Sequence, residues 1–210
     1  MPAEASWPEG LLVATHNPGK LAEWRQLLGP VEGAADLGLP EVEETAPDFL
    51  GNALHKAREA CRRAGRPALA EDAGLVVPAL GGLPGVRTRR FVEEHGGWAP
   101  AMEALLARLA SLGRPDAHRV AYLCALAVVH PDGRVWAAEA PAPGELVAAR
   151  GNGPGVCPWF QPQESPRTWA ELGPAWRRHH DHRARALEAL LGSPTGPGRE
   201  TLSSSGARTR

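Results

Sequence analysis

The sequence is poor in several polar residue types. Lysine occurs only at positions 20 and 56, so arginine supplies the other 21 of the 23 basic residues; isoleucine is absent, and asparagine occurs only at positions 17, 52 and 152. We interpret this as drift toward Arg, Ala, Gly and Pro. A guanidinium cannot imitate a compact ammonium, so a chain that has replaced almost every lysine should retain those that it needs. Lys20 and Lys56 are therefore the first candidate functional residues.

The sequence also has few cysteines and a net charge close to zero. The three cysteines, Cys61, Cys124 and Cys157, form no C-x-x-C pair, which disfavours a disulfide framework or a thiolate zinc site and fits a reducing cytoplasm. The formal net charge of −1 provides no broad positive field for a nucleic acid polymer. No apolar run reaches membrane-spanning length, and residues 1–10 do not have the pattern of a signal peptide. We expect a cytoplasmic protein that binds neither nucleic acid polymers nor membranes.

Length and composition indicate one globular domain. The 210 residues, 43% hydrophobic and 22% charged, are typical of a soluble single-domain protein. From residue 192 on, the chain has few apolar residues, so we expect a single domain over residues 1–191 and a disordered tail over 192–210.

Hydrophobic periodicity and capping residues predict alternating strands and helices. Asn17 suits an N-cap and Pro18 a first helical turn, and Asp48 suits a second N-cap. In chain order we expect a strand at 11–15, helices at 18–28 and 49–65, two strands within 67–77 interrupted by an acidic turn at 71–74, a helix at 98–112, a hairpin of strands at 120–130 and 134–139, a strand at 145–149, a loop to 166, and helices near 168–172 and 182–191.

Thr15, Asn17 and Lys20 lie at the first strand-to-helix junction. Backbone N–H groups at a helix start, together with a hydroxyl, an amide and an ammonium, form a corner suited to phosphate. A capped helix with a surface lysine is the alternative.

Asn52 and Lys56, four residues apart, share one face of the second helix. A solvated helix face would also explain them. The rarity of lysine and asparagine in this chain favours a functional role for both groups.

Acidic residues form the third candidate group. Glu43 and Glu44 lie in the Pro-rich segment, and Glu71 and Asp72 lie between apolar residues. Carboxylates brought close together repel each other and need a cation. Oxygen ligands of this kind suit Mg²⁺, which keeps several waters and bridges to substrate phosphates. The alternative is that these are unrelated surface acids.

A basic stretch near the C-terminal end is the last candidate group. Residues 177–183 read R-R-H-H-D-H-R. The chain has no histidine pair at the i, i+4 spacing of zinc helices, so contacts to phosphate or to a base by Arg177, His182 and Arg183 are favoured over a metal site. A solvated helix start remains an alternative.

Taken together, the motifs resemble those of the inosine triphosphatase family, whose members are pyrophosphatases that hydrolyse non-canonical purine nucleoside triphosphates. The matching stretches are T-H-N-P-G-K at 15–20, E-E-T at 43–45, N-A-L-H-K-A at 52–57, L-A-E-D-A-G-L at 69–75, G-G-L-P-G-V at 81–86 followed by Arg90, and D-H-R-x-x-A-L at 181–187. Their common order over residues 11–191 makes the resemblance specific.

The resemblance implies an α/β fold in which an elongated mixed β-sheet with flanking helices forms two lobes around a central cleft, commonly as a homodimer. It also implies Mg²⁺-dependent cleavage between the α- and β-phosphates. The implied metal ligands are Glu43, Glu44 and Asp72, and Asp72 would activate the attacking water. The implied substrate-binding residues are Thr15, Asn17, Lys20, Asn52, Lys56, Ala73, Arg90, Arg177, His182 and Arg183.

The base-reading motif departs from the family. Where the family has G-F-G-Y-D-P, with an aromatic that stacks on the base and an acid that bonds its edge, residues 153–158 read G-P-G-V-C-P. Arg177, Asp181 and Ala73 replace a lysine, a serine and a second serine of the family. We therefore expect altered or relaxed base preference, with Trp159 or Phe160 as a substitute platform. The alternatives are a non-catalytic nucleotide-binding paralogue and a pyrophosphatase for a different modified nucleotide.

Overall fold

The computed structural model describes residues 7–193 and contains one mixed six-stranded sheet in the order β2-β1-β3-β4-β5-β6. Strand β1 pairs in parallel with β2 and β3, and the other neighbouring pairs are antiparallel. The strands are β1 (Leu12–Val13), β2 (Glu32–Gly33), β3 (Ala68–Val76), β4 (Arg119–Val129), β5 (Val135–Leu146) and β6 (Phe160–Pro162). The helices are α1 (Pro18–Leu28), α2 (Phe49–Ala64), α3 (Thr88–Glu94), α4 (Trp98–Ser111), α5 (Trp169–His180) and α6 (His182–Gly192), with 3-10 turns η1 (Pro78–Leu80) and η2 (Gly85–Arg87).

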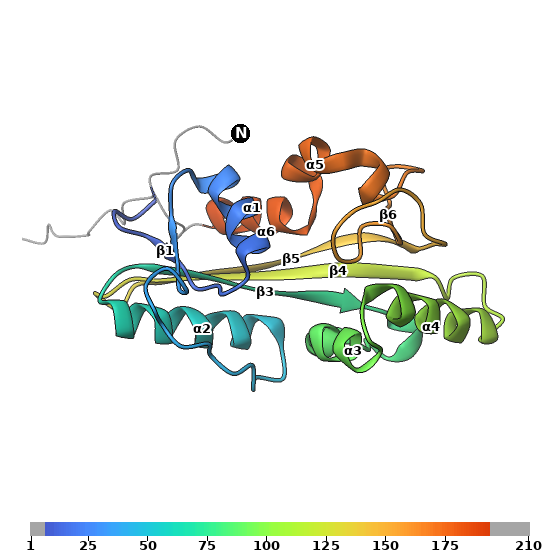
Figure 1. The fold of residues 1–210 in the computed structure, drawn as a ribbon, viewed down its shortest axis with the longest axis horizontal. Coiled ribbons are helices and arrows are strands. Elements are labelled where there is room, and N and C mark those ends of the chain that lie inside the picture. The colour runs from blue at the N-terminus through green and yellow to red at the C-terminus, as the bar shows by residue number, and fades with distance from the viewer. Residues whose placement is uncertain (1–6, 194–210) are drawn as a thin grey trace, which may run out of the picture.

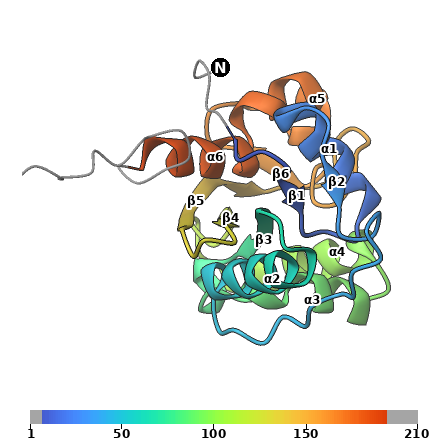
Figure 2. The ribbon, with the colours of Figure 1, turned by 90° about the vertical axis from the view of Figure 1, so that its left-hand side faces the viewer.

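Helices cover both faces of the sheet. Figure 1 shows α1, α5 and α6 on one face and α2, α3 and α4 on the other, and the end-on view in Figure 2 shows the same two layers. Long pairing between β4 and β5 gives the molecule its elongated shape. The predicted α/β fold, an elongated mixed sheet with flanking helices, is confirmed.

The apolar core has three parts. Small side chains such as Ala53 and Ala57 pack α2 closely against one face of the sheet. Trp24 of α1 and Leu190 of α6 fill the opposite face. At the far end, Met102 of α4 belongs to a third cluster that extends to α5 and β6. The cores on the two faces hold α1 and α2 against opposite sides of β3.

The predicted acidic turn at 71–74 is wrong. Strand β3 runs unbroken from Ala68 to Val76 and pairs with β4 throughout, with Glu71 opposite Leu126 and Asp72 opposite Ala125. Acids within an apolar run suggested a break because carboxylates are mostly exposed. Here basic side chains contact both carboxylates, so the strand stays regular and buried.

Other predicted boundaries also change. The strand expected at 145–149 is not separate, because β5 continues from the hairpin to Leu146. The predicted loop to 166 contains β6, and α5 extends to His180 across a kink at Gly173, whose φ is 77°. Strand β2 and helix α3 had no prediction. Of the tail predicted to be disordered, residues 194–210 lie outside the described part of the chain.

Candidate active site

A cavity opens where β1 leaves the sheet. Strand β1 ends at Val13, opposite Leu69 of β3, and the chain then turns into α1. The cavity, of about 140 Å³, lies at this opening. It brings together these predicted site residues: Thr15, Asn17, Lys20, Glu44, Lys56, Asp72 and Ala73.

The α1 corner has the predicted capping geometry. The Oδ1 atom of Asn17 accepts hydrogen bonds from the backbone N–H groups of Gly19 and Lys20, at 2.9 and 3.1 Å. The hydroxyl of Thr15 accepts the N–H of Asn17 at 3.2 Å. Pro18 occupies the first turn, as predicted. The positive end of α1 therefore lies at the cavity, an arrangement that favours an anion.

Lys20 pairs with Glu71, a buried carboxylate on β3. The Nζ atom of Lys20 lies 3.2 Å from Glu71 Oε1. Arg183 donates to the two Glu71 oxygens at 2.7 and 3.1 Å, and Trp24 Nε1 donates at 2.9 Å. Burial alone would raise the pKa of Glu71, but Arg183 and Lys20 outweigh it and hold this pKa well below its usual range. Glu71 is thus a fixed negative charge that orients two cations.

Lys56 pairs with two carboxylates from different segments. Its Nζ atom lies 2.8 Å from Glu44 Oε1 and 3.1 Å from Asp72 Oδ1. Asn52 donates to Asp72 Oδ2 at 3.1 Å, while Asn52 Oδ1 accepts the N–H of Ala46 at 2.9 Å. The backbone thereby fixes the orientation of the Asn52 amide. Burial raises the pKa of Asp72, reinforced by Glu44 and opposed by Lys56.

The two lysines reach the cavity from opposite sides of the sheet. Successive strand residues point to opposite faces, so Glu71 turns toward the α1 layer and Asp72 toward α2. Because β1 has already left the sheet, both faces are open at this edge. Lys20 and Lys56 therefore approach one opening from two helical layers.

The donor set at Asp72 fits a hard cation that keeps most of its own ligands. Glu44 and Asp72 share Lys56 as a partner, so their oxygens face one small region. Within residues 7–193 no group of three or more acidic, histidine or cysteine side chains could hold a metal. Mg²⁺ prefers one or two carboxylate ligands, with water and phosphate oxygens completing its coordination shell. Glu43 is exposed, and the structure places Glu44 beside Asp72.

A second cavity, of about 250 Å³, gathers the C-terminal basic residues. It is lined by Arg177, Asp181 and Arg183, and by Glu23 of α1. Glu23 accepts a hydrogen bond from Arg177 at 2.8 Å and forms an ion pair with Arg183. Glu71 pairs with Arg183 and Lys20, so it links the two cavities.

Contact with a base would require Arg183 and His182 to present unpaired, accessible side-chain atoms, and in this structure they do not. All three guanidinium nitrogens of Arg183 are paired with Glu71 or Glu23. His182 is buried, with its ring 4.6 Å from that of Tyr122 and 5.4 Å from that of Trp169. Burial and the nearby Arg183 hold its pKa well below the usual range. In this structure Arg183 is a link between carboxylates, and His182 belongs to the interior.

The altered base motif presents Gly153 and Pro154 to the second cavity. Its Val156 and Cys157 are buried. Phe160 is fully buried against Trp169, and Trp159 is only 9% exposed. A free ring face from either is therefore ruled out in this conformation, which corrects the expectation of a substitute platform.

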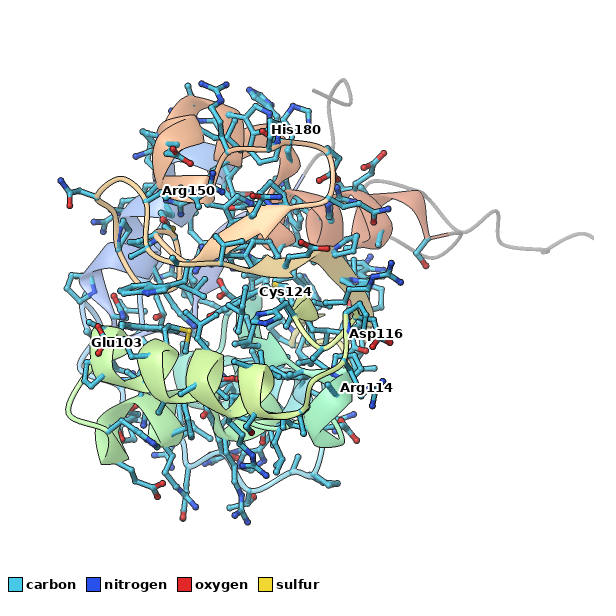
Figure 3. All side chains as sticks on the ribbon, turned by 90° about the vertical axis from the view of Figure 1, so that its right-hand side faces the viewer. Glu103, Arg114, Asp116, Cys124, Arg150 and His180 are labelled. Carbon is cyan, nitrogen blue, oxygen red and sulfur yellow. The ribbon has the colours of Figure 1, made fainter. Side chains whose placement is uncertain are left out.

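The remaining candidate positions line a third cavity or lie in the interior. Asn52, Glu43 and Arg90 line a third cavity, of about 830 Å³, between the 41–47 segment and α3. Cys124 lies in the interior (Figure 3) and is fully buried, and Cys61 and Cys157 are also buried. All three cysteines are free thiols.

Sequence reasoning missed the roles of Glu71, Glu23 and Trp24. Glu71 was a candidate acid, but its partner Arg183 lies 112 residues away. Glu23 follows Lys20 by three residues on α1, so the two share a helix face. That spacing was the available signal for Glu23.

Comparison with known proteins identifies related sequences. The model of the Ham1 family matches residues 11–193. A dITP/XTP pyrophosphatase of Rhodospirillum centenum is 41% identical over 187 residues, covering 86% of this chain and 92% of that protein. One of Caulobacter vibrioides is 42% identical over 186 residues, covering 86% and 95%.

Solved structures show the same relationship. A HAM1 protein from Coxiella burnetii superposes with a TM-score of 0.76 at 32% identity, covering 86% of this chain and 95% of that one. A dITP/XTP pyrophosphatase from Mycobacterium abscessus gives a TM-score of 0.70 at 38% identity, covering 87% and 99%. The family model, the sequence identity of these relatives and the shared fold show that this chain belongs to the Ham1 family.

Proposed function

We propose that this protein hydrolyses non-canonical purine nucleoside triphosphates, such as dITP and XTP, to the nucleoside monophosphate and pyrophosphate. The observation that carries the proposal is the convergence of the only two lysines of the chain with Asp72 at one cavity beside the N-terminus of α1. The substrates named for its relatives, dITP and XTP, support the same class of reaction.

The phosphate-binding end is assigned to α1 and the lysines. The Lys20 ammonium holds the β- and γ-phosphates, and the positive end of the α1 dipole favours their charge. Lys56, between Glu44 and Asp72, faces the phosphate that is attacked. Glu71 holds Lys20 in place because its own charge is fixed by Arg183. These groups offset the charge on a polyphosphate, which is the main requirement of phosphoryl-transfer catalysis.

Asp72 is assigned as the general base. It accepts a proton from the attacking water, whose oxygen bonds to the α-phosphorus while pyrophosphate leaves. Asn52 orients the carboxylate by donating to Oδ2, and burial brings its pKa closer to neutrality, which suits a base. We assign Glu44 and Asp72 as the residues that hold Mg²⁺. When bound, the ion supplies charge neutralisation and polarises the phosphate oxygens.

The test is a panel of nucleoside triphosphates incubated with Mg²⁺, with all products identified. We expect monophosphate and pyrophosphate, and we expect Asp72→Asn to lower kcat by about 100-fold or more. Diphosphate and orthophosphate as products would contradict the assigned reaction. Binding without turnover by the native chain would indicate the non-catalytic paralogue. Strong preference for dITP and XTP over every other triphosphate would contradict relaxed base selection.

The resemblance also implies a homodimer and a cytoplasmic location, and both stay predictions. Among the helices of residues 7–193, none combines the length and apolar character needed to cross a bilayer. Light scattering tests the assembly, since each chain has a mass of 22.3 kDa. A mass of two chains supports the dimer, and a mass of one chain contradicts it.

A further inference from the structure

One wall of the first cavity has no secondary structure of its own. This 39–44 wall contributes the lining residues Leu39, Pro40, Glu41, Val42 and Glu44, and it belongs to no helix or strand. Within residues 7–193, the N–H and C=O groups of residues 40–45 form no hydrogen bond with another backbone group. Backbone pairing is what normally fixes a segment. Side-chain contacts therefore determine where the 39–44 wall lies.

The end of the 39–44 wall is held by residues that already belong to the site. Glu44 lies 2.8 Å from Lys56 Nζ, and the N–H of Ala46 donates to Asn52 at 2.9 Å. Both contacts act on the last residue of the wall or beyond it. Neither of them places its first half.

Two contacts act on the first half. Glu41 pairs with Arg89 at 2.8 Å, but 61% and 66% of these side chains are exposed, and an ion pair in water contributes little. The Nε2 atom of His16 lies 2.7 Å from the carbonyl oxygen of Leu39. Since a carbonyl oxygen only accepts, Nε2 carries the proton and donates. His16 thus ties the start of the wall to the α1 corner.

We propose that His16 is a positioning residue that keeps Glu44 beside Asp72 and so sets the affinity of the site for a divalent cation. The inference rests on the proposed function, in which these two acids hold Mg²⁺. His16 lies between Thr15 and Asn17, whose side chains fix the turn into α1, so its ring has a rigid base. Loss of its bond frees the start of the 39–44 wall, and Glu44 then has to be ordered when the ion binds.

Two substitutions at position 16 test the bond itself. His16→Ala removes the donor, and His16→Gln supplies another one, because its side-chain amide also donates. His95→Ala is the matched control. His95 is an exposed histidine whose Nδ1 lies 2.8 Å from a backbone carbonyl oxygen, that of Phe91, and it lines none of the three cavities described above.

The measurement is the binding of Mn²⁺, used as a probe of the Mg²⁺ site and followed by the electron paramagnetic resonance of the free ion. We expect His16→Ala to weaken Mn²⁺ binding about 3- to 10-fold, the effect of losing one hydrogen bond. His16→Gln should bind as the native chain does, and His95→Ala should change nothing. The Mg²⁺ concentration for half-maximal pyrophosphate release should rise with the loss of affinity, while kcat at saturating Mg²⁺ stays close to the native value.

The Glu44→Gln background shows whether His16 acts through Glu44. There the ligand is already weakened, so His16→Ala should have little further effect, a coupling that a double-mutant cycle measures. Thermal unfolding verifies that each variant is folded. Unchanged Mn²⁺ affinity in folded His16→Ala, equal losses in His16→Ala and His16→Gln, or additive losses with Glu44→Gln would each overturn the proposal.

Failure of the proposed function has a different signature. If the native chain releases no pyrophosphate from any triphosphate, Mn²⁺ binding still reports on the 39–44 wall. The same fall for His16→Ala would then support the positioning role in a protein that only binds. A loss of affinity for inorganic tripolyphosphate in the presence of a chelator would show that His16 contacts phosphate directly, and would overturn the proposal.

Discussion

The partners of Lys56 favour an ammonium group over a guanidinium at this position. Lys56 is 12% exposed and lies between Glu44 and Asp72 at 2.8 and 3.1 Å. A guanidinium is larger and planar, and it binds carboxylates through two parallel contacts. Arginine would take both oxygens of one acid, whereas the ammonium contacts one oxygen of each. Geometry therefore explains why an ammonium group rather than a guanidinium occupies position 56 in this arginine-rich chain.

The adjacent acids Glu43 and Glu44 have different surroundings in the structure. Glu44 shares Lys56 with Asp72, while Glu43 is exposed. We expect Glu44→Gln to raise the Mg²⁺ concentration needed for half-maximal pyrophosphate release by at least about tenfold, since it removes a ligand oxygen charge. Glu43→Gln removes the same charge one residue away and serves as the comparison. A larger shift for Glu43→Gln would assign the ion to Glu43.

His182 predicts a pH dependence of stability. Burial and Arg183 lower its pKa in the folded state below the ordinary value of 6.5. Below pH 6.5 the unfolded chain takes up a proton that the folded chain does not, so stability falls on acidification. The loss is about 1.4 kcal/mol per pH unit until the folded pKa is reached. Above pH 6.5 the residue is neutral in both states and contributes no slope.

Denaturant unfolding between pH 5 and 8 measures this effect. The native chain should lose stability below pH 6.5, and His182→Gln should have a flatter profile over the same range. His95→Gln, which changes an exposed histidine, should retain the native slope. Equal slopes for the native chain and His182→Gln would show that His182 is not the group responsible.

Among the elements, β3 carries the site and depends on a close approach. A Cβ at Gly74 would lie 2.6 Å from both Gly85 O and Thr88 Oγ1. Thr88 accepts the N–H of Leu75 at 2.9 Å and donates to Gly85 O at 2.7 Å, and so joins η2 and α3 to the strand. Gly74 thus lets the segment containing Arg90 pack directly on β3.

Gly74→Ala should lower the free energy of unfolding by about 1–3 kcal/mol, because the added methyl displaces backbone as well as a side chain. Gly192→Ala is a matched control, since a Cβ there meets no atom within 4 Å and alanine favours a helix. Chemical denaturation measures both changes. Equal stability of Gly74→Ala and the native chain would contradict the close packing.

Elements defined by local signals were predictable, and those defined by neighbours were not. Helices α1 and α2 start where Asn17 and Asp48 predict, because a cap depends on a few adjacent residues. Strand β3 was read as broken at Glu71 because its stabilising cations come from other segments. Strands β2 and β6 are two and three residues long, too short to show periodicity.

Across the whole molecule, charge pairing links distant parts of the chain. Glu23 of α1 pairs with Arg177 of α5 and Arg183 of α6, and Glu71 connects Arg183 to Lys20. The α1 and C-terminal helices are therefore fixed relative to the phosphate-binding corner. Motif order predicted several of the residues that line the first cavity, but pairing over more than 100 residues depends on the folded sheet.

The central claim is that Lys20 and Lys56 serve one polyphosphate, and inorganic tripolyphosphate tests it without any base. Calorimetric affinity with Mg²⁺ should fall about 10-fold or more for Lys20→Met and for Lys56→Met, and the double variant should show coupling between them. Thermal unfolding verifies that each variant is folded. Unchanged affinity in either folded single variant would contradict a shared phosphate site.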